Sequence, residues 1–246
     1  MSYWRLFPFV SVDSLFVATP DDVIPQIACQ VQWKQGQWVV HCSGADSREV
    51  LEPAKAMGAH TGVFHPLQSF AGGGDPSSKF QGITFALEGE GALLDTLRGF
   101  ARDLGGDSIV LPAEDKVLYH ASAVIVSNYL VTLMGMGTEL WEKFDQPRNE
   151  AVKALLPLIK GTLENIEKVG LPDCLTGPIA RGDETTIAKH LQALKARDEN
   201  MLRAYCELGL QTIPIALAKG RINEAKARKL EALFHSAIKE EVKSYS

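Results

Sequence analysis

The sequence has only four cysteines, and none of them forms a CxxC pair or a tight cluster. Neither a zinc ribbon nor a dense disulfide framework is therefore indicated, and a reducing cytoplasm fits best. The histidines form no HExxH motif and no closely spaced pair, which argues against a catalytic metal. Basic residues do not outnumber acidic residues either. The 25 Lys and Arg against 30 Asp and Glu give a formal net charge of -5, which argues against a nucleic-acid partner or an acidic-membrane surface.

Charged residues are also missing from one long segment. No Asp, Glu, Lys or Arg occurs from Val117 to Thr138, a length sufficient to span a bilayer. The segment carries His120, Ser127 and Asn128, and polar groups inside a membrane are rare and costly. We therefore expect a buried central helix and no membrane partner. The N-terminal residues lack the regions of a signal peptide, which agrees with a cytoplasmic location.

The composition that remains is that of an ordinary globular protein, with 246 residues, 46% of them hydrophobic and 22% charged. In the first half, short apolar runs alternate with amphipathic segments. This alternation predicts strand and helix units in a parallel, doubly wound sheet. The expected strands are 14–19, 38–42, 61–64, 83–87 and 108–111, and the expected helices are 23–33, 47–57 and 91–104.

The second half changes in character after Pro112, where no further convincing strand occurs. Apolar residues recur there at helical spacing. The expected helices are 116–134, 149–169, 183–195, 198–218 and 222–243. The predicted fold class is α/β plus all-α, with a partial Rossmann-like domain over 1–112 and an all-helical domain over 113–246.

Residues at strand ends are the first candidates for a site, because ligands of open α/β sheets bind outside the carboxyl ends of the strands. Ser43 and Gly44 offer a hydroxyl and an unhindered N–H that could orient a carboxylate or carbonyl oxygen, or they form an ordinary turn. His65, followed by proline, faces a substrate or belongs to a rigid turn. Asp21 is also placed to cap the helix 23–33.

Polar residues form a stripe on the uncharged helix. His120, Ser127, Asn128 and Thr132 fall within an arc of roughly 140° at helical spacing. Buried polar groups need hydrogen-bond partners, so the stripe faces either an interdomain cleft or satisfied groups in the core.

A shaped loop, LTGPIARGD, lies at 175–183. Asp183 suits an N-cap, with Thr186 three positions later. Arg181 has a planar guanidinium that could clamp an anionic substrate. A plain helix start and an anion site both remain open at this loop.

Together, five segments resemble one family: VATPDD (17–22), HCSG (41–44), HPLQSF (65–70), YHASAVIVSN (119–128) and LTGPIARGD (175–183). This family comprises Rossmann-like proteins whose C-terminal helical domain is a domain of unknown function, related to the 6-phosphogluconate dehydrogenase and ketopantoate reductase group. The resemblance implies a nicotinamide-dependent oxidoreductase that forms a homodimer through its helical domain. Some members look like an alternative type of ketopantoate reductase in pantothenate synthesis, reducing a 2-keto acid with NADPH. NAD as cofactor and another keto or hydroxy acid as substrate stay open.

The resemblance also suggests roles for single residues. Asn128 matches an asparagine that polarises the substrate in the larger superfamily, but Val124 stands where the partner lysine would be. We therefore expect His120 to donate the proton and Asn128 to orient the carbonyl oxygen, with Arg181 or Ser43 holding the carboxylate. The other expected substrate contacts are Gly44, His65, Ser127, Thr176 and Asp183, and the expected cofactor contacts are Thr19, Pro20, Asp21 and Ser43.

Members of that family open with a GxGxxG fingerprint, which this sequence does not contain. Its densest glycine stretch, 72–74, opens no helix in the predicted pattern and cannot cradle a diphosphate. We therefore expect an N-terminally truncated domain that contacts only the nicotinamide side of the cofactor, or a non-catalytic dimeric binding protein. The strand 14–19 would then form an edge of the sheet, covered by the aromatic segment 3–9.

Overall fold

The computed structural model describes residues 13–71 and 76–242. The aromatic segment 3–9 and the glycine stretch 72–74 lie outside the described residues. The chain forms two compact units, residues 1–131 and 132–246. Strands end near the predicted boundary at residue 112, but the helix that follows packs with the first unit, which therefore extends to Val131.

A five-stranded sheet in the order β1-β2-β3-β4-β5 forms the first unit. Its strands are β1 (Ser14–Val17), β2 (Trp38–His41), β3 (His60–Pro66), β4 (Thr84–Glu88) and β5 (Asp107–Val110). All five predicted strands are confirmed. The prediction of a wholly parallel sheet is wrong, because β4 runs antiparallel to β3 and parallel to β5. Between β3 and β4 the described residues contain only the short 3-10 helix η3 (Pro76–Phe80), and parallel neighbours need a longer crossover.

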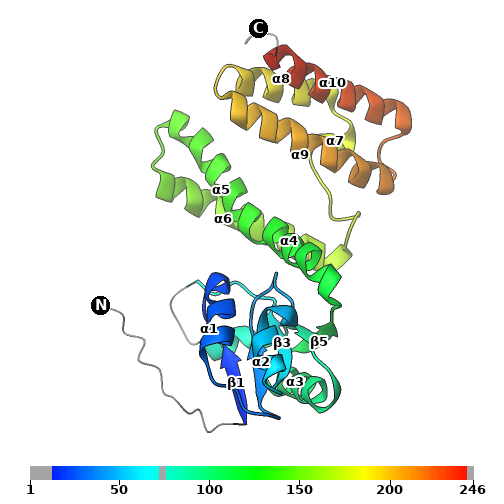
Figure 1. Cartoon of the computed structure of the whole chain (residues 1–246). Coiled ribbons are helices and arrows are strands. Elements are labelled where there is room, and N and C mark those ends of the chain that lie inside the picture. The colour runs from blue at the N-terminus through cyan, green and yellow to red at the C-terminus, as the bar shows by residue number, and fades with distance from the viewer. Residues whose placement is uncertain (1–12, 72–75, 243–246) are drawn as a thin grey trace. The chain divides into compact units, whose positions relative to one another are not determined.

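Helices cover both faces of this sheet (Figure 1). One face carries α1 (Ile24–Gln30), η2 (Arg48–Leu51) and α2 (Glu52–Ala56), and the other carries α3 (Gly91–Asp103). Because side chains of a strand alternate between faces, Val39 packs in the core beneath α1 and α2, whereas Val40 packs beneath α3. Both cores are apolar. The polar residues that follow the strands lie outside them, at the edge of the sheet.

The uncharged segment forms two helices, α4 (Lys116–Val126), preceded by η4 (Ala113–Asp115), and α5 (Asn128–Trp141), with a break at Ser127. Our expectation of a buried helix is wrong for the single chain. Val117, Leu118, Ile125 and Val126 are between 59% and 73% exposed, because the first unit covers only one side of α4. By length and composition alone, the run Ala113–Trp141 could cross a bilayer.

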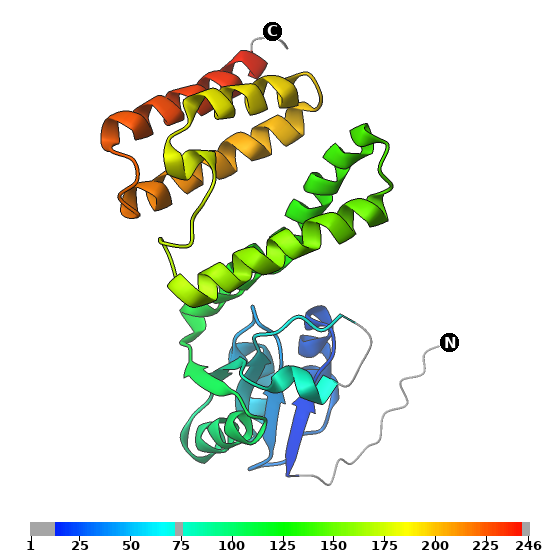
Figure 2. The ribbon, with the colours of Figure 1, turned by 180° about the vertical axis from the view of Figure 1, so that it is seen from behind.

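The second unit is helical, as predicted. Its helices are α6 (Arg148–Val169), α7 (Pro178–Arg181), α8 (Glu184–Lys195), α9 (Glu199–Ala218) and α10 (Glu224–Val242), with the short turn η5 (Glu142–Phe144) before them. The helices α8, α9 and α10 lie side by side (Figure 2) around a core that includes Cys206 and Phe234. Gly209 lets α9 and α10 approach, since a Cβ there would lie 2.4 Å from Cζ of Phe234.

Candidate active site at the carboxyl ends of β1 to β3

Three parallel strands, β1, β2 and β3, end at the same edge of the sheet in the first unit. Their carboxyl ends bring together loops that the sequence separates by more than twenty residues. The buried Ser43 lies at the centre. Its hydroxyl Oγ lies 2.9 Å from Oδ2 of Asp21 and 3.1 Å from Oδ2 of Asp46, and it accepts the Asp46 N–H at 3.0 Å. Since a hydroxyl has one proton, it donates to only one of the two carboxylates at a time.

Asp21 differs from its predicted role as a helix cap. It starts the 3-10 helix η1 (Asp21–Val23), and α1 begins only at Ile24 without a side-chain cap. The carboxylate instead binds Ser43, because the tight 3-10 turn places Asp21 beside the end of β2 rather than over the first N–H groups of α1. The predicted capping role is therefore wrong, and Asp21 joins the site.

The fully buried His41 holds this loop in place through two hydrogen bonds. Its Nδ1 accepts the Ser43 N–H at 3.1 Å, so Nε2 carries the proton and donates to the Ser47 carbonyl at 3.0 Å. Burial lowers the pKa of His41 and keeps the ring neutral. Both ring nitrogens are thus used within the loop, which makes His41 a structural residue.

Gly44 marks the closest approach between the strand ends and α4. A Cβ at Gly44 would lie 2.7 Å from Nε2 of His65 and 2.8 Å from Cδ2 of His120. Atoms cannot pack so closely, so only glycine allows both rings to sit against this backbone. The structure thereby brings together Gly44, His65 and His120, three residues that the sequence nominated separately.

His65 pairs with Tyr119, and its ring lies edge-on to the ring of His120. The Tyr119 hydroxyl lies 2.9 Å from Nδ1 of His65, and burial raises the pKa of Tyr119 to about 12, so this hydroxyl keeps its proton. Burial, followed by the charges of Lys116 and His120, lowers the pKa of His65 to about 4. His65 is therefore neutral at physiological pH and unsuited to donate a proton as an imidazolium.

A cavity of about 460 Å³ opens beside these residues within the first unit. It is lined by His65, His120, Ser127 and Asn128, together with Gln68 and apolar residues of α4. Of the predicted polar stripe, His120 on α4, Ser127 at the break and Asn128 at the start of α5 thus line one cavity, which Val126 also borders. Thr132, the fourth member of the stripe, belongs to the second unit.

Lys116 is a site residue that sequence reasoning missed. Its side chain is 1% exposed, and Nζ donates to the Ser43 carbonyl oxygen at 3.3 Å. Burial lowers the pKa of Lys116, and the carboxylates of Glu88, Asp46 and Asp21 oppose this shift. Its only signal in the sequence is its position directly before the uncharged run, two turns ahead of Val124.

Comparison with known proteins places the chain in a family. The profile of a domain of unknown function, DUF2520, matches residues 83–212, which is more than half of the 246 residues. The chain belongs to this family. A comparison with curated proteins gives no match. The DUF2520 region contains Lys116, His120 and Asn128, whereas Asp21, Ser43 and His65 precede it.

Solved structures show the same fold as this DUF2520 protein. Protein TM1727 from Thermotoga maritima is 28% identical with a TM-score of 0.72, and the match covers 84% of this chain and 79% of that chain. BF3122 from Bacteroides fragilis, provisionally assigned as an NADP oxidoreductase, is 24% identical with a TM-score of 0.69, covering 85% and 78%. Pyrroline carboxylate reductase from Plasmodium falciparum, solved with NADP bound, is 14% identical with a TM-score of 0.53, covering 90% and 77%. A Rossmann-like domain followed by a helical domain is therefore the fold of this chain.

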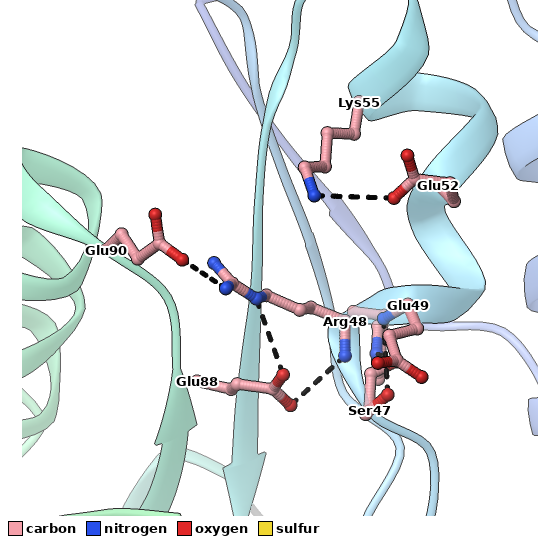
Figure 3. A network of polar contacts seen from close by, with 8 residues as sticks. Ser47, Arg48, Glu49, Glu52, Lys55, Glu88 and Glu90 are labelled. Atoms are coloured by element: carbon pink, nitrogen blue, oxygen red, sulfur yellow. Dashed lines mark hydrogen bonds and ion pairs between the residues drawn. The ribbon is translucent and has the colours of Figure 1, made fainter. Parts of the chain in front are cut away.

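A second cavity of the DUF2520 protein, about 470 Å³, lies over the charged network of Figure 3. Arg48 donates its backbone N–H to Oε2 of Glu88 at 3.1 Å, places its Nε 3.5 Å from Oε1 of Glu88 and also pairs with Glu90. Two carboxylates thus occupy the one guanidinium, and two further acids, Glu49 and Glu52, line the cavity. The network ties η2 to β4 and α3, and it is ill suited to bind an anion.

Of the remaining predicted site residues, Thr19 and Pro20 follow β1 in the first unit, whereas Thr176, Arg181 and Asp183 belong to the second unit. Thr176 and Arg181 are exposed, and Asp183 caps α8 by accepting the Thr186 N–H at 3.0 Å and the Thr186 hydroxyl at 2.7 Å. The predicted N-cap is confirmed. Roles of these three residues in substrate binding stay predictions. In the part of the chain that the structure describes, no group of three or more His, Cys, Asp or Glu is placed to hold a metal ion.

Proposed function

We propose that the protein is an NADPH-dependent reductase that converts a 2-oxo acid into a 2-hydroxy acid, with ketopantoate as the first substrate to test. The observation that carries the proposal is the meeting of Gly44, His65 and His120 beside a cavity at the carboxyl ends of three parallel strands. Ligands of open α/β sheets bind at this edge. Ketopantoate rests on the family resemblance of the sequence alone.

The described residues fit the nicotinamide end of the cofactor. The Thr19 hydroxyl oxygen, just beyond β1, is buried and has no hydrogen-bond partner among the described residues. A buried polar atom without a partner is costly, and a ligand group such as a carboxamide would satisfy it. Pro20, Asp21 and Ser43 lie along the same edge. When bound, NADPH supplies a hydride to the substrate carbon.

The chain's own residues supply the remaining parts of the reaction. His120 donates a proton to the carbonyl oxygen as that oxygen becomes a hydroxyl, and the Asn128 amide orients the same oxygen. The Gly44 N–H binds the substrate carboxylate, whereas the Ser43 proton is already used by Asp21 or Asp46. The neutral His65 completes the cavity wall as a hydrogen-bonding group.

Substitution of Thr19 by valine tests the cofactor assignment. Valine keeps the shape of threonine but removes the hydroxyl, so we expect NADPH to bind about tenfold more weakly, the value of one hydrogen bond. The free energy of unfolding should stay unchanged or rise by about 1 kcal/mol, because a buried unsatisfied atom is lost. Calorimetric titration with NADPH and urea denaturation measure the two effects.

The matched control is Thr96→Val, since the exposed Thr96 hydroxyl bonds the Ala92 carbonyl within α3. This variant should bind NADPH like the unchanged protein. Equal affinity of the Thr19 variant would remove Thr19 from the cofactor site. If the unchanged protein neither binds NADPH nor consumes it with ketopantoate, the chain is instead a non-catalytic binding protein.

A second copy of the chain is the partner that we propose for the exposed side of α4. Val117, Leu118 and Ile125 form one apolar face there, within an arc of about 100°, and soluble single chains rarely expose such contiguous surfaces. The same helix carries His120 into a cavity of the first unit, and a polar group of this kind argues for a protein neighbour over lipid. The family resemblance likewise implies a homodimer.

Introducing a charge tests this dimer. We expect Ile125→Glu to raise the dissociation constant of the dimer at least tenfold, because a carboxylate would be desolvated in the interface. Light scattering over a range of protein concentrations measures the change. The control is Ile109→Glu on β5, which is also exposed but does not belong to the apolar face of α4. A monomeric unchanged protein would contradict the proposal.

A further inference from the structure

The buried Lys116 contacts the loop that follows β2. Its Nζ donates to the carbonyl oxygen of Ser43, which is the oxygen of the peptide bond joining Ser43 to Gly44. Among the described residues the only cis peptide bond precedes Pro172, so the Ser43–Gly44 bond is trans. In a trans peptide the carbonyl and the N–H point in opposite directions. The Gly44 N–H therefore points away from Lys116.

The Gly44 N–H lies on the side of this peptide opposite to the oxygen that Lys116 binds. Gly44 is buried, and in the part of the chain that the structure describes no acceptor binds its N–H. Buried backbone N–H groups nearly always find a partner, so this one is available to a ligand oxygen. Both imidazole rings of the site, His65 and His120, lie against the same glycine.

A purely structural role explains Lys116 poorly. Burying an ammonium for one carbonyl hydrogen bond is costly, and well-packed apolar residues often replace buried charges without loss of stability. The nearby carboxylates of Glu88, Asp46 and Asp21 reduce this cost by their charge, but Glu88 is itself bound by Arg48. The one direct partner of Nζ among the described residues is the Ser43–Gly44 peptide, against which the rings of His65 and His120 pack.

We propose that Lys116 is a positioning residue, which fixes and polarises the Ser43–Gly44 peptide so that the Gly44 N–H binds an oxygen of an anionic 2-oxo acid. An ammonium on the carbonyl oxygen draws electron density from the peptide and strengthens its N–H as a donor. The identity of the substrate rests on the proposed function, whereas the polarised peptide does not.

Nuclear magnetic resonance of the full chain without ligand tests the polarised peptide. We expect Lys116→Met to move the carbonyl ¹³C signal of Ser43 and the amide ¹H and ¹⁵N signals of Gly44 upfield, with most other amide signals unchanged. Lys116→Arg, which keeps a charged donor, should restore most of the shift. Lys55→Met serves as the control, since Lys55 is exposed and pairs with Glu52. Unmoved Ser43 and Gly44 signals in Lys116→Met would overturn the proposal.

Binding of oxamate, an unreactive analogue of a 2-oxo acid, tests the ligand. We expect Lys116→Met to weaken oxamate binding about tenfold and Lys116→Arg less than threefold, with the affinity for NADPH unchanged in both. Unchanged oxamate binding in Lys116→Met would contradict the positioning role. Should Lys116→Met not fold, Lys116→Gln replaces it, because the shorter neutral side chain does not reach the Ser43 oxygen. If the amide signals move but the unchanged protein binds neither oxamate nor NADPH, the proposed function fails and the polarised peptide stands.

Discussion

Replacing His120 with alanine is expected to lower kcat for NADPH-dependent reduction of a 2-oxo acid by about 10²- to 10⁴-fold, the usual contribution of a positioned proton donor. His120 lines the cavity beside Asn128, and its ring packs against Gly44. Burial holds the pKa of the neighbouring His65 at about 4, so that ring cannot take over the proton transfer. Steady-state kinetics with ketopantoate and NADPH measure the loss.

The kinetic loss should be confined to the chemical step. Because His120 acts on the substrate oxygen, the affinity for NADPH should change little, and the melting temperature should stay close to that of the unchanged protein. His60→Ala removes an exposed histidine at the start of β3 and serves as the control. A His120→Ala enzyme with unchanged kcat would refute the assignment, whereas equal losses in both variants would indicate a structural effect.

Substitution of Gly209 by alanine is expected to destabilise the second unit by about 1–3 kcal/mol, the range for overpacked cores. A Cβ at this position would lie 2.4 Å from Cζ and 2.7 Å from Cε1 of Phe234, whose ring is fully buried. Either the ring or the two helices α9 and α10 must move to make room. Urea denaturation followed by circular dichroism measures the effect.

The same substitution at Gly161 has the opposite expected sign. Gly161 lies inside α6, and no atom lies within 4 Å of a Cβ placed there. Alanine should therefore stabilise the protein by about 0.5–1 kcal/mol, because it favours the helix over glycine. A destabilised Gly161→Ala variant, or a Gly209→Ala variant as stable as the unchanged protein, would show that packing at α9 and α10 is looser than the structure indicates.

Much of the fold follows from local patterns in the sequence. Apolar runs of four to six residues predict all five strands, and the helix at Gly91–Asp103 follows from its apolar spacing. The direction of β4 does not follow, because it depends on whether the chain crosses the sheet between residues 67 and 83, and no periodic pattern marks a crossover there. Asp183 capped its helix as predicted, since capping is decided within four residues.

Less of the candidate site than of the fold could be predicted from the sequence. Ser43, His65 and His120 could be nominated because they follow strands or interrupt an apolar helix, but their meeting at Gly44 depends on tertiary packing. Lys116 could not be nominated, since a lysine at the first turn of a helix is normally solvated. Its burial arises because the end of β2 lies over α4, a contact between segments 73 residues apart.

In the proposed dimer, α4 would connect the candidate active site to the interface between the two chains. One side carries Lys116 and His120 against the strand ends, and the other presents Ile125 and its apolar neighbours to the proposed partner copy. A rigid helix cannot turn one side without turning the other. Assembly would therefore set the rotation of α4 about its own axis, and with it the distance between His120, the proposed proton donor, and the Ser43–Gly44 peptide. Catalytic competence would then be a property of the pair of chains.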